Sequence, residues 1–162
     1  MPNWCKGNLK IRGKKENIIR FLKEGTSLLD GFWEPKEIEP EIEINDYDEI
    51  EIKNINKEKG IYCLYIKGTR RNFIDPIENE IYIHDTDEEE QIICLKNFKA
   101  AWGIDADALK VISKRYGIDI KIYAFEAGME FNQDIEIVKG KIIKDEEIKF
   151  KNYVWECVEP NL

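Results

Sequence analysis

The sequence predicts an α+β fold of the ferredoxin-like type, a split βαβ sandwich in which two helices cover one face of an antiparallel sheet. Two observations indicate this fold. Two segments carry apolar residues at helical spacing, and several others alternate between apolar and polar residues. The segments follow one another as strand, helix, insertion, three strands, helix and strand, with further strands trailing. We expect a single domain over residues 1–162, with an acidic insertion at about 26–60.

The first strand and helix carry the clearest local signals. Residues 8–12 alternate between polar and apolar side chains, as in a strand with one buried face. From 14 to 24, apolar residues that include Ile18 and Phe21 recur at helical spacing, and Gly25 ends the helix.

The following stretch, 26–60, differs in kind because acidic residues and prolines dominate it. Alternation at 41–44 and 49–55 predicts one or two half-exposed strands, with a hairpin turn at 45–48. We interpret the stretch as an insertion that is too short to build a core of its own.

The rest of the chain predicts more strands and one helix. The helix spans 105–116, has acids near its start and bases near its end, and is closed by Gly117. Lys139 and Gly140 suit a tight turn. Strands are expected at 61–67, 80–84, 90–95, 118–125, 131–138, 141–143 and 153–158.

Composition limits the class of protein. The 162 residues have a formal net charge of −8 and are 43% hydrophobic, which favours an acidic globular protein and argues against one that coats nucleic acid by neutralising phosphates. No stretch is long and apolar enough for a membrane helix, and the first residues lack the apolar core of a signal peptide. We therefore expect a cytoplasmic protein without membrane contact.

The residue types needed for common cofactor and catalytic sites are scarce. The four cysteines form no C-x-x-C pair, and phosphate-binding glycine motifs and H-E-x-x-H are absent, so we expect no metal and no cofactor. His84 is the only histidine and is expected to be exposed at a strand end. Glu126, before Gly128, is the best-placed carboxylate but lacks a partner. The sequence favours a protein that is not an enzyme.

The charge is uneven along the chain and suggests an acidic interface. Residues 31–60 carry −6 and 61–90 carry −5, whereas 1–30 carry +4 and 91–117 carry +3. Such a surface attracts a positively charged partner, although it would also serve solubility alone. The candidate partner-binding residues are Glu41, Glu43, Asp46, Asp48, Glu49, Glu51, Asp85, Asp87, Glu88 and Glu89.

The alternative is a nucleic-acid-binding accessory protein that uses its basic helical face. The residues proposed for this role are Lys14, Lys15, Arg20, Lys110, Lys114 and Arg115. Tyr82, Tyr123 and Phe125 could lie together on one sheet face and stack on bases, although core packing is the competing interpretation. A hydrolase built on the carboxylates is a third hypothesis.

Four segments resemble one known family. MPNWCKGNLKIRG at 1–13 is similar to the N-terminus of the YubB ferredoxin-like family of phages, prophages and plasmids. KGTRRN at 67–72 resembles its W-G-T-K-W-[DN] segment, and FKAAW at 98–102 its F-x-T-A-W segment. SKRY at 113–116, with 123–131, resembles its closing strand and E-x-G turn. Here Lys67 and Arg71 replace the two tryptophans of the family's pattern, and 103–105 replace its S-P-P.

The resemblance implies a ferredoxin-like fold, a mobile-element origin and no established enzymatic activity. Trp4 and Asn8 would anchor the first strand, with Trp4 packed against one of the helices. By analogy with small acidic phage proteins, the leading hypothesis is a non-catalytic protein that binds and inhibits a host defence protein, such as a CRISPR effector, through its acidic surface.

Overall fold

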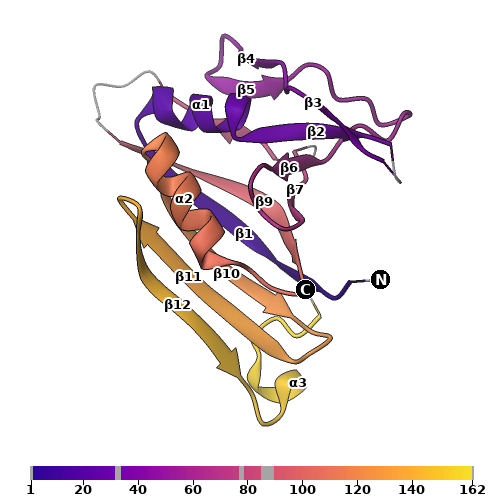
Figure 1. The fold of residues 1–162 in the computed structure, drawn as a ribbon, viewed down its shortest axis with the longest axis vertical. Helices are drawn as coiled ribbons and strands as arrows, with labels where there is room; N and C mark the ends of the chain where they lie inside the picture. The colour runs from indigo at the N-terminus through magenta and orange to yellow at the C-terminus, as the bar shows by residue number, and fades with distance from the viewer. Residues whose placement is uncertain (1, 32–33, 77–78, 85–89, 162) are drawn as a thin grey trace.

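The computed structural model in Figure 1 describes residues 2–31, 34–76, 79–84 and 90–161. It is an α+β structure, mostly antiparallel, and its described residues form a nine-stranded sheet, a three-stranded sheet and three short helices. The elements are β1 (Trp4–Gly13), α1 (Lys15–Glu24), β2 (Thr26–Asp30), β3 (Lys36–Ile38), β4 (Ile42–Ile44), β5 (Glu49–Ile52), β6 (Leu64–Ile66), β7 (Asn72–Ile74), β8 (Ile81–Tyr82), β9 (Gln91–Ala101), α2 (Ala106–Tyr116), β10 (Asp119–Glu126), β11 (Phe131–Val138), β12 (Lys141–Lys149) and α3 (Tyr153–Glu156).

The strand β1 lies inside the large sheet, whose order is β12-β11-β10-β1-β9-β7-β6-β2-β3. Its side chains alternate, so that Leu9 and Ile11 are buried while Lys10 and Arg12 are exposed. The pairing with β9 shifts register between Gly7 and Leu9, which marks a bulge. One face of β1 therefore belongs to the core, and the other faces solvent.

The helices α1 and α2 lie on the near side of the sheet in Figure 1 and cover its apolar face. The Asp105 carboxylate caps α2 by accepting the N–H groups of Asp107 and Ala108, and Gly117 ends the helix in the left-handed conformation. The rings of Phe21 and Tyr116 meet edge to face at 5.7 Å, which joins the two helices. The predicted bounds of both helices are confirmed to within one residue.

The connections produce one split βαβ unit and a wider second one. In the first, β9 and β10 are joined through α2, and β1 lies between them. In the second, β1 and β2 are joined through α1, and β9, β7 and β6 lie between them. Every step across that half is antiparallel, so β2 runs parallel to β1. A ferredoxin-like sheet has one intervening strand in both units.

The stretch 26–60 contributes to both sheets. The predicted hairpin is present, since β4 and β5 pair and residues 45–48 connect them. Ile42 and Ile50 from this hairpin join the same buried cluster as the large sheet. The strands β2 and β3 were not predicted and extend the large sheet, with Thr26, Ser27 and Leu28 buried.

Three further differences separate prediction and structure. The strand β7 was not among the predicted strands. The strand expected at 153–158 is wrong, because Tyr153–Glu156 form the short helix α3, capped by the side chain of Asn152. The strands β1, β9 and β12 are longer than expected, whereas the two-residue turn at Lys139 and Gly140 is confirmed by the positive φ angles of both residues. Within the described ranges, no helix is both long and apolar enough to span a membrane.

Candidate functional site

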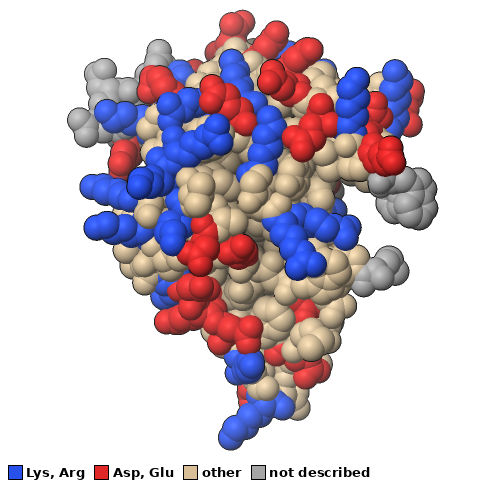
Figure 2. All heavy atoms as spheres, viewed as in Figure 1, with Lys and Arg blue, Asp and Glu red and all other residues tan. Residues whose placement is uncertain are grey.

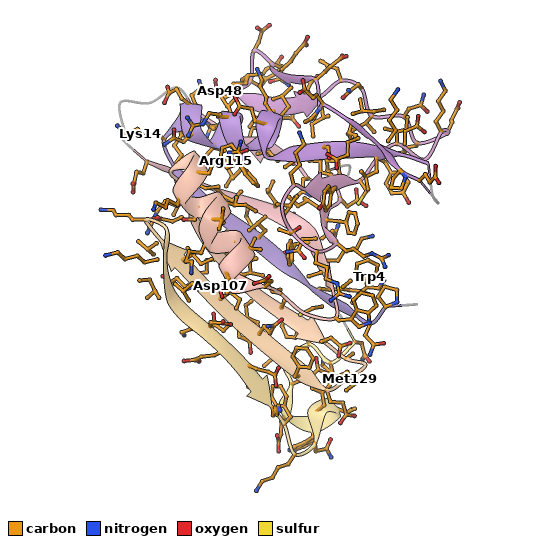
Figure 3. All side chains as sticks on the ribbon, in the orientation of Figure 1. Trp4, Lys14, Asp48, Asp107, Arg115 and Met129 are labelled. Carbon is orange, nitrogen blue, oxygen red and sulfur yellow. The ribbon has the colours of Figure 1, made fainter. Side chains whose placement is uncertain are left out.

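A cleft of about 750 Å³ lies between the N-terminal end of β1 and the strands β2, β6 and β7. Trp4, labelled in Figure 3, marks its position at the start of β1. We call this site the aromatic cleft and define it by the three rings and three cations among its lining residues. They are Trp4, Tyr65, Phe73, Arg70, Arg71 and Lys99.

The three rings form a continuous row. Phe73 lies in the middle, with its ring centre 6.0 Å from that of Trp4 and 5.8 Å from that of Tyr65. The Tyr65 hydroxyl donates a hydrogen bond of 2.7 Å to the backbone carbonyl of Thr69, which fixes the orientation of its ring. The row is therefore pre-organised, and it offers half-buried ring surface to a planar ligand.

Two of the three cations lie over the rings of this row, and the third lies over a neighbouring ring, Trp102. Lys99 Nζ lies 5.3 Å from the centre of the Trp4 ring and 5.9 Å from that of Phe73. The Arg71 guanidinium lies 5.6 Å from the centre of the Trp4 ring. Arg70 lies 5.1 Å from the ring centre of Trp102, beside the cleft. These are cation–π distances, and within the described part of the chain no ion pair compensates any of the three charges.

Two residues at the aromatic cleft have a backbone conformation that is uncommon for residues other than glycine. Arg71 has φ of 58° and Trp102 has φ of 63°, both in the left-handed region. Backbone hydrogen bonds hold them there, from Ala101 N–H to the Arg71 carbonyl and from Trp102 N–H to the Asn3 carbonyl. Backbone strain of this kind concentrates at binding sites, where the fold keeps a side chain in place.

The remaining polar groups of the cleft do not form a catalytic arrangement. Burial raises the pKa of the Cys63 thiol, so it stays protonated near neutral pH. The Glu37 carboxylate accepts a hydrogen bond of 3.1 Å from the Ser27 hydroxyl. Glu37 is also the one acid among the described lining residues, against three cations. What the cleft can do chemically is hold a flat, negatively charged ligand.

Six of the acidic residues predicted for partner binding do come together, on or beside the β4–β5 hairpin. We call them the acidic hairpin: Glu41, Glu43, Asp46, Asp48, Glu49 and Glu51. Part of their charge is compensated, because Lys53 pairs with Glu51 and Glu43. The neutral Asn45 amide also donates a hydrogen bond to Glu51 at 2.8 Å. The other four, Asp85, Asp87, Glu88 and Glu89, lie outside the described residues.

The predicted basic residues lie on α1 and α2 and at their ends, and in Figure 3 Lys14 and Arg115 lie close to the junction of the two helices. Arg20 donates to the carbonyl of Arg115 at 3.1 Å, and both guanidinium groups lie over the Tyr116 ring. Lys110 pairs instead with Asp107, one turn earlier. Figure 2 shows the basic side chains of this face interspersed with acidic ones. The six are Lys14, Lys15, Arg20, Lys110, Lys114 and Arg115, and we call them the basic helical group.

The predicted aromatic residues separate into two places. Tyr123 and Phe125 lie on the same face of β10, with ring centres 5.3 Å apart, whereas Tyr82 belongs to β8 in the small sheet. Trp4 is not packed against a helix as expected, because it alternates with the buried Cys5 and therefore lies on the solvent face of the sheet, against Phe73.

The residues that the sequence offered for catalysis or metal binding, Glu126, His84 and the cysteines, do not come together in a shared site. Glu126 is 1% exposed, and its carboxylate accepts the N–H groups of Gly128 at 3.0 Å and Met129 at 2.6 Å. His84 is exposed, as expected, with Nδ1 3.4 Å from Asp48. The four cysteines are free thiols. Among the described residues, no three His, Cys, Asp or Glu side chains are grouped so as to hold a metal ion.

Sequence reasoning did not predict the aromatic cleft, although a signal was present. Its residues come from four separate strands and the turn between β6 and β7, and none of them belongs to a spaced motif. However, three of the segments singled out for their resemblance converge on it: 1–13 supplies Trp4, 67–72 supplies Arg70 and Arg71, and 98–102 supplies Lys99.

Comparison of the chain with protein-family models, with curated proteins and with solved structures found no match in any of the three.

Proposed function

We propose that this chain is a non-catalytic binding protein whose aromatic cleft holds a nucleotide unit, with the base on the aromatic row and the phosphate among the cations. The observation that carries the proposal is the convergence of Trp4, Phe73 and Tyr65 with Arg70, Arg71 and Lys99 in one cavity.

The two halves of a nucleotide fit the two kinds of side chain. A base has a π-face whatever its identity, and stacking on an aromatic side chain contributes about 1–3 kcal/mol. Arginine binds phosphate through parallel hydrogen bonds, and lysine binds it as a point charge. Since Arg71 and Lys99 already lie 5.3–5.9 Å from the ring centres of the row, base and phosphate could be contacted together. The absence of an acid–base pair among the described lining residues supports binding without catalysis.

The net charge of −8 opposes this ligand at long range but not within the cleft. Charges separated by more than about 10 Å are largely screened at 0.1 M salt. Within the described lining, three cations face one carboxylate, so the local balance is positive. The acidic hairpin belongs to the small sheet and supplies none of the described lining residues.

Tryptophan fluorescence tests the proposal. The Trp155→Phe variant removes an exposed indole on α3 and serves as the background. Titration with UMP and AMP is expected to quench the remaining emission saturably, and Trp4→Ala in the same background is expected to abolish most of the quenching. Saturable binding that survives Trp4→Ala unchanged would place the ligand elsewhere, and no binding of either nucleotide at millimolar concentration would refute the proposal.

The second candidate is the hypothesis of an acidic interface, and the grouping of six acids on the acidic hairpin favours it. Such a surface would occupy a basic groove on a host protein, for example a CRISPR effector, and block it. Co-purification from host lysate tests this. We expect a partner that is retained at low salt and released at high salt. The same partner should be lost when Glu41, Glu43 and Asp46 are replaced by lysine. Retention at both salt concentrations, or no partner at all, would count against it.

The connections between the strands of the large sheet also suggest how the fold is related to a ferredoxin-like one. We propose that the large sheet is an elaborated ferredoxin-like sheet, in which the β6–β7 hairpin separates β2 from β9. The unit β9–α2–β10 around β1 and the parallel direction of β2 support this. The resemblance of four segments to the YubB family points the same way and carries the proposal of a phage or plasmid origin.

A further inference from the structure

The solvent face of the large sheet continues directly from the aromatic cleft. Trp4 shares this face of β1 with Lys6, Asn8 and Lys10, which are exposed, while the opposite face is buried beneath the helices. The short helix α3 covers this face at β11, where the Tyr153 hydroxyl donates to the Asn132 side chain at 3.0 Å, and the Asn132 amide donates in turn to the Tyr123 hydroxyl of β10 at 3.3 Å. Beyond this contact, the side chains along β1 and the Tyr123 ring remain exposed, and we call this part the open face.

The cleft and the open face share neighbouring side chains. Lys6 stands opposite Lys99 on β9 and opposite Phe125 on β10. Asn8 stands opposite Tyr123, which is 38% exposed and contacts Phe125. A shallow hollow of about 230 Å³, lined in part by Lys6, Asp75 and Lys99, lies beside the cleft. A row of alternating cations and rings thus runs from Trp4 towards Lys10.

The charges of this face divide into compensated and uncompensated ones. Arg12 pairs with Asp119 at 2.6 Å, and Lys121 pairs with Glu136 at 3.0 Å. Lys6 and Lys10 form no ion pair with any described residue. The uncompensated lysines are therefore those in line with the cleft. Exposed rings beside basic residues along one sheet face are the arrangement that binds single strands.

We propose that the nucleotide unit in the aromatic cleft belongs to a single-stranded nucleic acid, which continues along β1 over Lys6 and Tyr123 to Lys10. This inference rests on the proposed function of the cleft and extends it from a nucleotide to a strand. From Trp4 to Lys10 the face spans about 20 Å at roughly 3.3 Å per residue. A strand with stacked bases about 3.4 Å apart would place roughly six nucleotides on it.

A length series tests the inference. The affinity of the full chain is measured by fluorescence anisotropy, in competition with a labelled hexamer, for UMP and for uridine and thymidine oligomers of two, four, six and ten units. We expect affinity to rise at least tenfold from UMP to the hexamer and then to level off. Comparison of the two series tells RNA from DNA as the preferred strand.

Variants locate the path. Lys10→Ala and Tyr123→Ala are each expected to lower hexamer affinity several-fold and to leave UMP binding unchanged. Lys121→Ala, the matched control on the same face, is expected to change hexamer affinity by less than twofold, because its charge is already paired. Equal affinity for UMP and the hexamer, or no effect of either test variant, would overturn the strand while leaving the cleft intact. Absence of binding to UMP and to every oligomer would overturn both proposals.

Discussion

The guanidinium of Arg71 lies 5.6 Å from the centre of the Trp4 ring and is presented by a residue in the left-handed region, with φ of 58°. The two residues are far apart in the sequence, and β9 lies between β1, which begins at Trp4, and β7, which follows Arg71. In our account this pair is the centre of the aromatic cleft, where a base and a phosphate would be held side by side.

Two substitutions of Arg71 should have the same effect on nucleotide binding but different effects on stability. Arg71→Gly removes the guanidinium but relieves the left-handed strain, which costs about 1–2 kcal/mol for a residue with a Cβ. We expect nucleotide affinity to fall about tenfold, in line with the loss of a charged hydrogen bond. Arg71→Ala should bind equally poorly yet be less stable than Arg71→Gly by about 1 kcal/mol in urea unfolding. Equal stability of the two variants would show that no strain is stored at this position.

The salt dependence of hexamer affinity measures how many phosphates the protein neutralises. For single strands, the slope of log K against log salt is about −0.7 for each neutralised phosphate. We expect Lys99→Ala to make the hexamer slope shallower by about 0.7. Lys149→Ala on the edge strand β12, where the ammonium already pairs with Glu147 at 3.1 Å, is expected to leave the slope unchanged. Equal slopes for both variants would remove Lys99 from the interface.

Glu126 is expected to matter for stability and not for binding. Glu126→Gln replaces a buried carboxylate that accepts two backbone N–H groups by an amide with one acceptor oxygen. The free energy of unfolding should fall by about 1–3 kcal/mol. Nucleotide affinity should not change, since Glu126 does not line the aromatic cleft. Glu130→Gln at an exposed position four residues later, in the same turn, is the control, and a comparable loss of stability there would argue against the two hydrogen bonds of Glu126 as the cause.

The buried thiol of Cys5 makes the fold sensitive to base. Burial, aided by the nearby Glu126 charge, raises the pKa of Cys5 from 9.0 to about 12. The folded state therefore keeps the proton longer than the unfolded state, so this contribution to stability is complete below pH 9 and is lost as pH rises towards 12. Between pH 8 and pH 10 we expect a loss of roughly 1 kcal/mol from this group. Cys5→Ala should be less stable at pH 8 but should show a smaller decline with pH in urea unfolding. An undiminished decline in this variant would assign the effect to other groups.

Elements with a regular pattern were predictable, and irregular ones were not. The helix over Ala106–Tyr116 was predictable because cap, periodicity and closing glycine agree. The strand β2 was missed because its residues TSLLD do not alternate, and its first three residues are buried by tertiary packing. The helix α3 was mistaken for a strand because its aromatic and β-branched residues favour strands, whereas the Asn152 side chain caps a helical turn.

The candidate site depended on information that local patterns do not contain. Trp4 was expected to pack against a helix and Lys99 lay outside the predicted strands, whereas their meeting is set by the register between β1 and β9. The acidic hairpin, by contrast, is a local feature, so its residues were predicted together and lie together.

Photo-crosslinking tests the central claim most directly. A uridine hexamer carrying 5-iodouridine is irradiated with the unmodified chain, and the crosslinked residue is identified by mass spectrometry. Binding in the aromatic cleft predicts adducts on Trp4, Tyr65 or Phe73, which are lost on competition with unlabelled hexamer. Adducts confined to Tyr116, the ring beneath the basic helical group, or no adduct that unlabelled hexamer can displace, would contradict the account.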